Sequence, residues 1–164
     1  MAKAWILFCL ICCAFAFSSW VPHRNLLEVA IAEIGVREAT GHNDGLRVGE
    51  YQRAAACSKG DPWCACFVSW VFKQAGYVQP RTGWSPALFP PSRLVIKPKR
   101  GCVFGIYVAS KKRIAHCGII ERVHGSRLYT IEGNTDIKGS SEGDGVYRKV
   151  RHLNRIKYFA EWRG

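Results

Sequence analysis

The sequence is short of acidic residues, has no internal repeat and leaves no room for a second large domain. Twelve Asp and Glu residues accompany 24 Lys and Arg residues, so the formal net charge is +12. The missing repeat excludes a solenoid or propeller, and 164 residues with 48% hydrophobic content suffice for one cored domain. The positive surplus favours an anionic polymer as partner, and a merely solubilising surface is the alternative.

Metal-binding motifs are also scarce. The residues that could together bind zinc are Cys57, Cys64, Cys66 and His116. The Cys-x-Cys spacing suits a tetrahedral site poorly, and no second paired half follows it. The acidic residues Asp44, Glu50 and Asp61 are scattered and form no recognisable calcium loop. We therefore expect no metal site and no cofactor, while calcium dependence stays open.

An apolar run occupies residues 4–21 and follows a single Lys3. Such a run predicts a secretory signal peptide, with the Ala-x-Ala sequence at 14–16 as a cleavage site. An uncleaved N-terminal anchor is the alternative, because a spanning helix becomes feasible at ~18 apolar residues. We expect export to the periplasm, the cell envelope or the medium, and membrane contact only through an uncleaved segment. In that setting an anionic wall polymer is a better target than nucleic acid.

The cysteine count is odd once residues 1–21 are set aside. The remaining cysteines are Cys57, Cys64, Cys66, Cys102 and Cys117. An odd number leaves at least one free thiol, and we expect Cys64 to be free. Cys57 with Cys66 stays open as a disulfide pair.

Helical signals precede strand signals along the chain. A helix capped by Asn25 and stopped by Gly35 is followed by helices at about 47–56 and 64–75. Five prolines then predict an ordered loop over residues 80–100, in which Trp84 and Phe89 are packing anchors or substrate contacts.

The second half of the chain is rich in β-branched and aromatic residues. The expected strands span 102–108, 114–123, 127–132, 146–151 and about 155–161. Short connections favour an antiparallel meander. Helices first and strands afterwards predict an α+β fold.

The segment Asp61-Pro62-Trp63-Cys64 predicts the start of a helix. Asp61 can cap the helix and Pro62 suits its first position, so Cys64 lies in the first turn. The positive end of the helix dipole favours a thiolate there. Cys64 is thus a candidate nucleophile.

A hairpin joining 114–123 to 127–132 predicts the partners of that nucleophile. If 123 pairs with 127, Glu132 lies opposite Gly118 and Asn134 lies opposite His116, all on one face. A helix carrying Cys64 laid on that face gives a nucleophile, a base and an orienting group. Glu132 or Asn134 then accepts from the second ring nitrogen of His116.

These segments resemble the CHAP domain, the cysteine- and histidine-dependent amidohydrolase/peptidase family of papain-like fold. The matching segments are 43–51, PWCACFVSW at 62–70, HCGI at 116–119 and EGN at 132–134. The resemblance covers roughly residues 25–162, within a predicted catalytic domain of residues 22–164. Cys102 and Ala115 depart from the family pattern beside the expected site, which bears on substrate fit.

The resemblance implies a peptidoglycan hydrolase, acting as an N-acetylmuramoyl-L-alanine amidase or an endopeptidase. The family's nucleophile falls on Cys64, its base on His116 and its polar partners on Glu132 and Asn134. We expect Trp63 and Trp84 to contact substrate and the protein to be a monomer. A catalytically inactive wall-binding scaffold of the same fold and an antibacterial toxin with the same chemistry are the alternatives.

Overall fold

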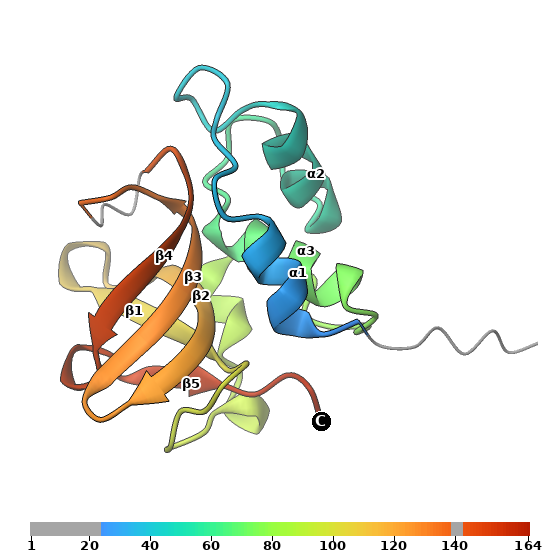
Figure 1. Ribbon diagram of the computed structural model, residues 1–164. Coiled ribbons are helices and arrows are strands. Elements are labelled where there is room, and N and C mark those ends of the chain that lie inside the picture. Colours follow the sequence, from blue (N-terminus) through green and yellow to red (C-terminus); the bar gives the residue numbers. More distant parts are fainter. Residues whose placement is uncertain (1–23, 139–142) are drawn as a thin grey trace, which may run out of the picture.

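The helices and the β-sheet lie side by side, as Figure 1 shows for the computed structural model. The structure describes residues 24–138 and 143–164, so the predicted signal or anchor segment lies outside it. Within these ranges, no helix combines the length and the apolar character needed to cross a membrane. The predicted α+β class is confirmed.

Three α-helices build the first half: α1 (Leu26–Ala32), α2 (Leu46–Ala54) and α3 (Cys64–Gln74). The Asn25 side chain caps α1 by accepting from the Leu27 backbone N–H at 3.0 Å, as predicted. The loop after α3 contains two short 3-10 helices, η1 (Ser85–Leu88) and η2 (Pro91–Arg93).

The predicted cap of α3 is wrong. The Asp61 carboxylate accepts from the Ser58 backbone N–H at 2.8 Å and so stabilises the preceding turn. Trp63 occupies the N-cap position without a side-chain hydrogen bond, and Cys64 is the first helical residue. The backbone N–H of Cys64 therefore has no acceptor within the helix.

The sheet has the strand order β4-β3-β2-β1-β5. The strands are β1 (Val103–Val108), β2 (Arg113–His124), β3 (Arg127–Thr135), β4 (Gly145–His152) and β5 (Tyr158–Ala160), with short 3-10 turns η3 (Ala109–Lys111) and η4 (Leu153–Arg155). The predicted meander holds for the first four strands and is wrong for β5. That strand pairs with β1 because Phe159 and Ile156 bury their side chains in one cluster with Phe104.

The predicted strand register is right near the site and wrong near the turns. Ile119 pairs with Ile131 and Ile106 pairs with His116, as expected. At the hairpin, Val123 pairs with Leu128 instead of Arg127, because the turn is one residue shorter than predicted. Two irregularities in β2, at Ala115 and Glu121, restore the predicted register between them.

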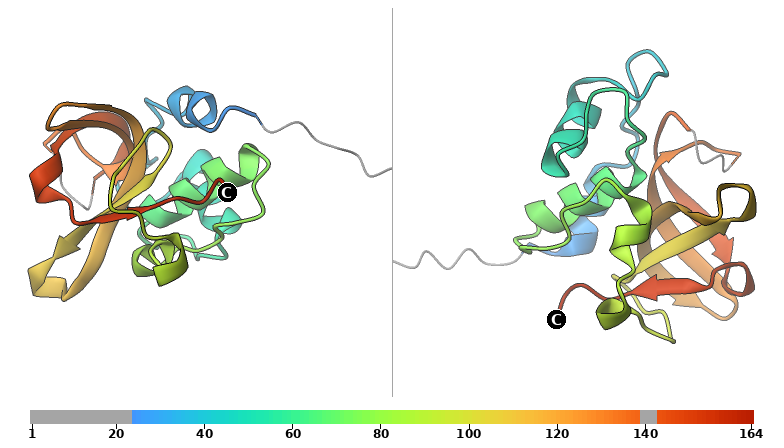
Figure 2. Two further views of the ribbon diagram at one scale, coloured as in Figure 1. Left: turned by 90° about the horizontal axis from the view of Figure 1, so that it is seen from below. Right: turned by 180° about the vertical axis from the view of Figure 1, so that it is seen from behind.

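The two faces of the sheet bury different partners. Val103, Cys117, Ile119 and Ile131 pack with the helices, whereas Phe104, Ile120 and Leu128 form a second cluster on the other face. The two further views in Figure 2 show the helices gathered on one side of the curved sheet.

The helix that carries Cys64 therefore does not cover the predicted face. It packs on the face of Cys117, whereas a Cβ at Gly118 would lie 2.8 Å from both Glu132 and Phe104, on the opposite face. The reason is the polarity of the sheet faces. The helix packs on an apolar surface, and His116 and Glu132 make the opposite face polar at this point. Only the first residue of α3 reaches the polar pair.

Candidate active site

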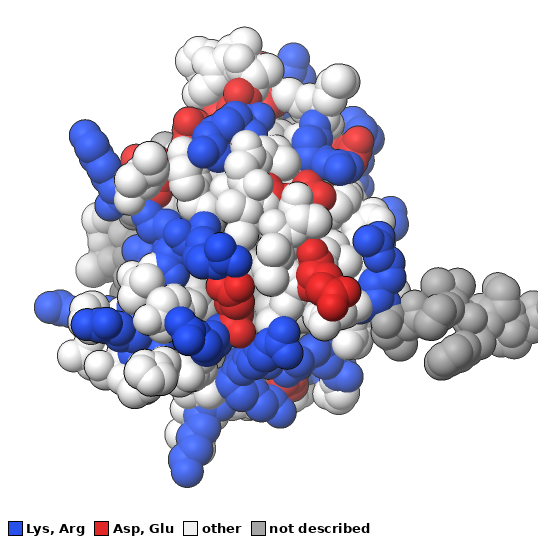
Figure 3. Space-filling view, in the orientation of Figure 1, with Lys and Arg blue, Asp and Glu red and all other residues white. Residues whose placement is uncertain are grey.

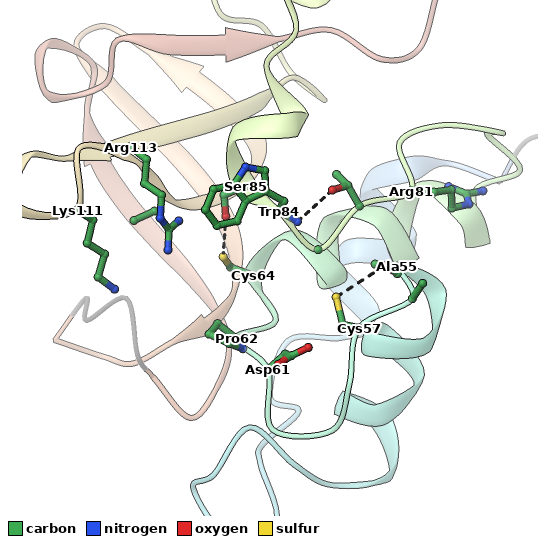
Figure 4. A pocket seen from close by; sticks show the side chains of 14 residues that line it. Ala55, Cys57, Asp61, Pro62, Cys64, Arg81, Trp84, Ser85, Lys111 and Arg113 are labelled. Carbon is green, nitrogen blue, oxygen red and sulfur yellow. Dashed lines mark hydrogen bonds between the residues drawn. The ribbon is translucent and has the colours of Figure 1, made fainter.

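The thiol of Cys64 lies at the wall of a cavity of about 470 Å³ between the helices and the sheet. Figure 4 shows Cys64 and Ser85 at its centre, with Lys111 and Arg113 reaching in from the sheet side. Cys64 comes from the first turn of α3 and Ser85 from the start of η1. The predicted nucleophile is thus buried, yet it borders a space that a ligand can enter.

The predicted base is fixed by a buried carboxylate. His116 Nε2 lies 2.8 Å from Glu132 Oε2, and the two side chains are 2% and 0% exposed. Among the described residues, His116 Nδ1 has no hydrogen-bond partner. The Glu132 contact assigns the Nε2 proton to that bond, which leaves Nδ1 for the nucleophile.

Glu132 is held ionised by two further donors that sequence reasoning missed. Arg151 donates from Nε and Nη2 to its two oxygens at 2.9 and 2.6 Å, and Thr130 donates to Oε1 at 2.6 Å. Burial alone would raise the pKa of the Glu132 carboxyl, but the hydrogen bonds from Arg151 and His116 outweigh it and hold the pKa at about 2. Glu132 therefore stays a carboxylate at every physiological pH.

Cys64 and His116 form a mutually stabilised pair. Burial alone would lower the pKa of His116, but the neighbouring Cys64 sulfur and the Glu132 carboxylate raise it to about 9. The pKa of Cys64 lies well below its ordinary value because the neighbouring Cys117 thiol and His116 imidazolium stabilise the sulfur's charge by more than burial disfavours it. Both shifts favour a thiolate beside an imidazolium over the neutral pair.

Cys117 and Ser85 are functional candidates that the sequence did not reveal. Cys64 Sγ lies 3.4 Å from Ser85 Oγ, and Cys117 Sγ lies 4.0 Å from the same oxygen. Burial and the neighbouring Cys64 sulfur raise the pKa of Cys117 well above its ordinary value, so it stays a protonated donor. Adjacency to the predicted base, His116, is the one sequence signal for Cys117, and the sequence carries none for Ser85.

Asn134 lies near the site but does not touch the imidazole. Its amide nitrogen donates to Asn43 Oδ1 at 2.8 Å and to the Gly143 carbonyl at 3.2 Å. Its oxygen accepts from the Trp63 backbone N–H at 3.4 Å, immediately before the helix that carries Cys64. Of the two predicted orienting groups, the structure therefore brings only Glu132 to the ring.

The two tryptophans predicted to bind substrate differ in their surroundings. Trp63 is 0% exposed, stacks on Tyr51 at 5.5 Å and donates from Nε1 to Glu38 at 2.7 Å, so no ligand can reach it. The prediction for Trp63 is wrong because the ring completes the helical core. Trp84 is 54% exposed and lines the cavity, whereas Phe89 is a buried anchor.

Cys57 and Cys66 lie together, and Cys102 lies elsewhere. Cys66 donates to Cys57 Sγ at 2.9 Å, and both are free thiols. Cys102 lies in the second cluster, 3.8 Å from Glu161, and not beside the site as expected; Ala115 does line the cavity. Within residues 24–138 and 143–164, no group of three or more His, Cys, Asp and Glu side chains could hold a metal ion.

Comparison with known protein families gives a match. The CHAP domain family model matches residues 56–134, which include Cys64, His116 and Glu132. A search of curated proteins gave no match.

Two solved structures are similar to the chain: Ly7917, and Ly7917 with the hydrolyzing product of MDP. Both have a TM-score of 0.47 and 16% identity, over 82% and 84% of this chain. The chain spans about three fifths of the length of those structures. On the family match, the segment that carries this site is a CHAP domain, a member of the cysteine- and histidine-dependent amidohydrolase/peptidase family.

Proposed function

We propose that the protein is a peptidoglycan hydrolase that cleaves amide bonds of cell-wall peptide, as an N-acetylmuramoyl-L-alanine amidase or an endopeptidase. The observation that carries the proposal is the buried His116, held by Glu132 on one side and coupled to Cys64 on the other. The CHAP match supports a cysteine-dependent amidohydrolase. An inert scaffold of the same fold would have no use for a Cys64 thiol with a strongly lowered pKa.

The first chemical step is attack of the Cys64 thiolate on the carbonyl carbon of the amide. The C–N bond breaks, the His116 imidazolium gives its proton to the leaving amine, and a thioester remains on the sulfur. Water, deprotonated by the now neutral His116, then attacks the thioester carbon. The products are a carboxylic acid and the restored thiolate–imidazolium pair.

The oxyanion formed in each step needs donors placed beforehand. The backbone N–H of Cys64 is available because it begins α3, and the Ser85 hydroxyl lies 3.4 Å from the sulfur. An oxyanion hole usually consists of two such donors beside the reacting carbon. Trp84 supplies an exposed ring at the cavity wall for contact with the substrate.

The charge of the molecule supports an anionic wall polymer as the target. In Figure 3, Lys and Arg side chains gather over the sheet side of the visible face and outnumber Asp and Glu. A positive surface raises the local concentration of an anionic polymer without a separate binding module. We include export of the protein in the proposal, because the wall lies outside the cytoplasm.

Digestion of purified peptidoglycan tests the proposal. The wild type should release new amine ends, identified by mass analysis of the fragments, and Cys64→Ser should lose at least about 10³-fold of this activity. Cys66→Ser is the matched control, two residues along the same helix, and should retain it. Equal release by Cys64→Ser and the wild type would remove Cys64 from the mechanism, and no release by the wild type would reject the function.

A further inference from the structure

The cavity beside Cys64 has a basic wall. Its charged lining residues are Arg81, Lys111, Arg113 and Asp61. Three of the four are cations, and Figure 4 shows Lys111 and Arg113 together on the sheet side, away from Asp61. A volume of about 470 Å³ is within the range that holds a small ligand or a few residues of a peptide.

Arg81 serves the fold. Its guanidinium donates to the backbone carbonyls of Ser69, Pro80 and Tyr77 and so fixes the chain after α3. Figure 4 shows the side chain directed away from Cys64. Asp61 is also occupied, since its carboxylate accepts from the Ser58 backbone N–H.

Arg113 is arranged differently. Its guanidinium lies 4.4 Å above the centre of the Trp84 ring, and Nη1 donates to the Ile114 carbonyl at 3.1 Å. In the part of the chain that the structure describes, no carboxylate pairs with this guanidinium. A guanidinium has five N–H donors in a planar fork that fits a carboxylate, so a positioned group with donors to spare faces the cavity.

The position of Arg113 along β2 sets the distance to the chemistry. It precedes His116 by three residues on the same strand, which is at most roughly 10 Å at the usual rise per strand residue, because the irregularity at Ala115 lies between them. A peptide whose amide lies at Cys64 would therefore present a group one or two residues away from the cleaved bond to Arg113. The exposed Trp84 ring contacts the guanidinium and so positions it at that place.

We propose that Arg113, held on Trp84, is a specificity-determining residue that binds a carboxylate of the substrate, namely the α-carboxyl of the glutamate residue in the wall peptide. The inference rests on the proposed function, since it concerns the same cavity and the same class of substrate. It adds that a free carboxyl group at this residue is required for efficient cleavage. The same peptide with a carboxamide there is a poor substrate, because it loses the charge-assisted contact.

The test uses two muropeptides that differ only in the glutamate α-carboxyl, which is free in one and a carboxamide in the other. The wild type should show a kcat/KM at least about tenfold higher for the free acid, in line with a charge-assisted hydrogen bond. Arg113→Gln should bring the ratio of the two values close to one, mainly through a higher KM for the acid. Trp84→Leu should reduce the ratio by a smaller factor.

Arg122→Gln is the matched control. The Arg122 guanidinium lies 4.0 Å above the Tyr129 ring, in the same kind of contact but outside the cavity lining. This variant should keep the wild-type ratio. The rate of Cys64 alkylation, measured in every variant, checks that the site has folded.

Calorimetric titration of Cys64→Ala with both muropeptides separates the two hypotheses. Cleavage of both peptides at equal kcat/KM by the wild type overturns the carboxylate subsite and leaves the proposed function standing. Tighter binding of the acid, lost with Arg113→Gln in the same background, without any cleavage by the wild type, overturns the proposed function and keeps the subsite.

Discussion

Cys64 and Cys66 lie in the same first turn of α3, both buried, yet their thiols have opposite tendencies. The pKa of Cys64 lies well below its ordinary value, because Cys117, His116 and Ser85 surround the sulfur. Burial and the neighbouring Cys57 thiol raise the pKa of Cys66. The Cys66 sulfur donates to Cys57 and lies 3.9 Å from the Pro62 carbonyl, so it meets no cation.

This difference shows that the helix dipole does not decide which thiol becomes the nucleophile. Both sulfurs lie near the same positive helix end, whose effect covers the whole first turn. The deciding contribution is the set of side chains that faces each sulfur. The Cys117 thiol and the His116 imidazolium stabilise the charge on Cys64, whereas Cys66 is itself the donor to a second thiol. Each removal or alteration of a group around Cys64 should therefore reduce the difference between the pKa values of Cys64 and Cys66.

Removal of the base should have the largest effect. His116→Ala should lower hydrolysis by about 10³-fold or more, because the leaving amine loses its acid and the thiolate its counter-ion. The alkylation of Cys64 at pH 6 should fall to the rate of an ordinary thiol. A variant that keeps fast alkylation at pH 6 would show that His116 does not set the pKa of Cys64.

Loss of the carboxylate behind the base should have the next largest effect. Glu132→Gln should reduce kcat by about 10²-fold, because the imidazolium loses the charge that raises its pKa. The wild type should also lose stability as the pH falls from 4.5 toward 2, since the folded pKa of Glu132 is depressed. Circular dichroism should find that the variant lacks this acid-dependent loss, and an identical acid dependence would contradict the assigned pKa.

The pH dependence of the wild type should separate the two members of the pair. Hydrolysis should fall about tenfold per pH unit above pH 9, where His116 loses the proton required by the leaving amine. Alkylation of Cys64 should stay level over the same range, because its thiolate is already formed. Any labelling of Cys66 should increase with pH instead. Mass spectrometry of the labelled peptides distinguishes the sites.

Removal of the hydroxyl should have the smallest effect. Ser85→Ala should lower kcat by about three- to tenfold, since one neutral donor to the sulfur or the oxyanion is lost while the backbone donor remains. Ser92→Ala, in the same loop and outside the cavity lining, is the control and should retain the wild-type kcat. An unchanged kcat in Ser85→Ala would restrict this hydroxyl to a packing role.

Local patterns sufficed to predict most of the fold. The Asn25 cap, the proline-rich loop and the alternating strands each depend on neighbouring residues, so their positions could be read from the sequence. The partner of β5 could not, because it depends on which distant apolar residues it buries. The packing face of α3 could not be predicted from the pairing of His116 with Glu132, because the helix packs on the apolar face of Cys117, Ile119 and Ile131.

The part of the site that lies within the β2–β3 hairpin, His116 with Glu132, could be predicted from the sequence. Counting across the β2–β3 turn placed Glu132 near His116, although a one-residue error at the turn was cancelled by the irregularity at Glu121. Arg151 was missed because its register depends on the long connection before β4. Ser85 was missed because nothing local links η1 to a sulfur far along the chain.

The placement of β5 beside β1 also bears on the order of folding. Pairings between distant segments form slowly, and the sheet that holds His116 is complete only when residues 158–160 have joined its far edge. Until the two halves of the chain meet, Cys64 is an ordinary protonated thiol with a pKa of about 8.5. Cys64 in an unfolded chain therefore reacts slowly at neutral pH. The appearance of a fast-reacting Cys64 thiol reports that folding is complete.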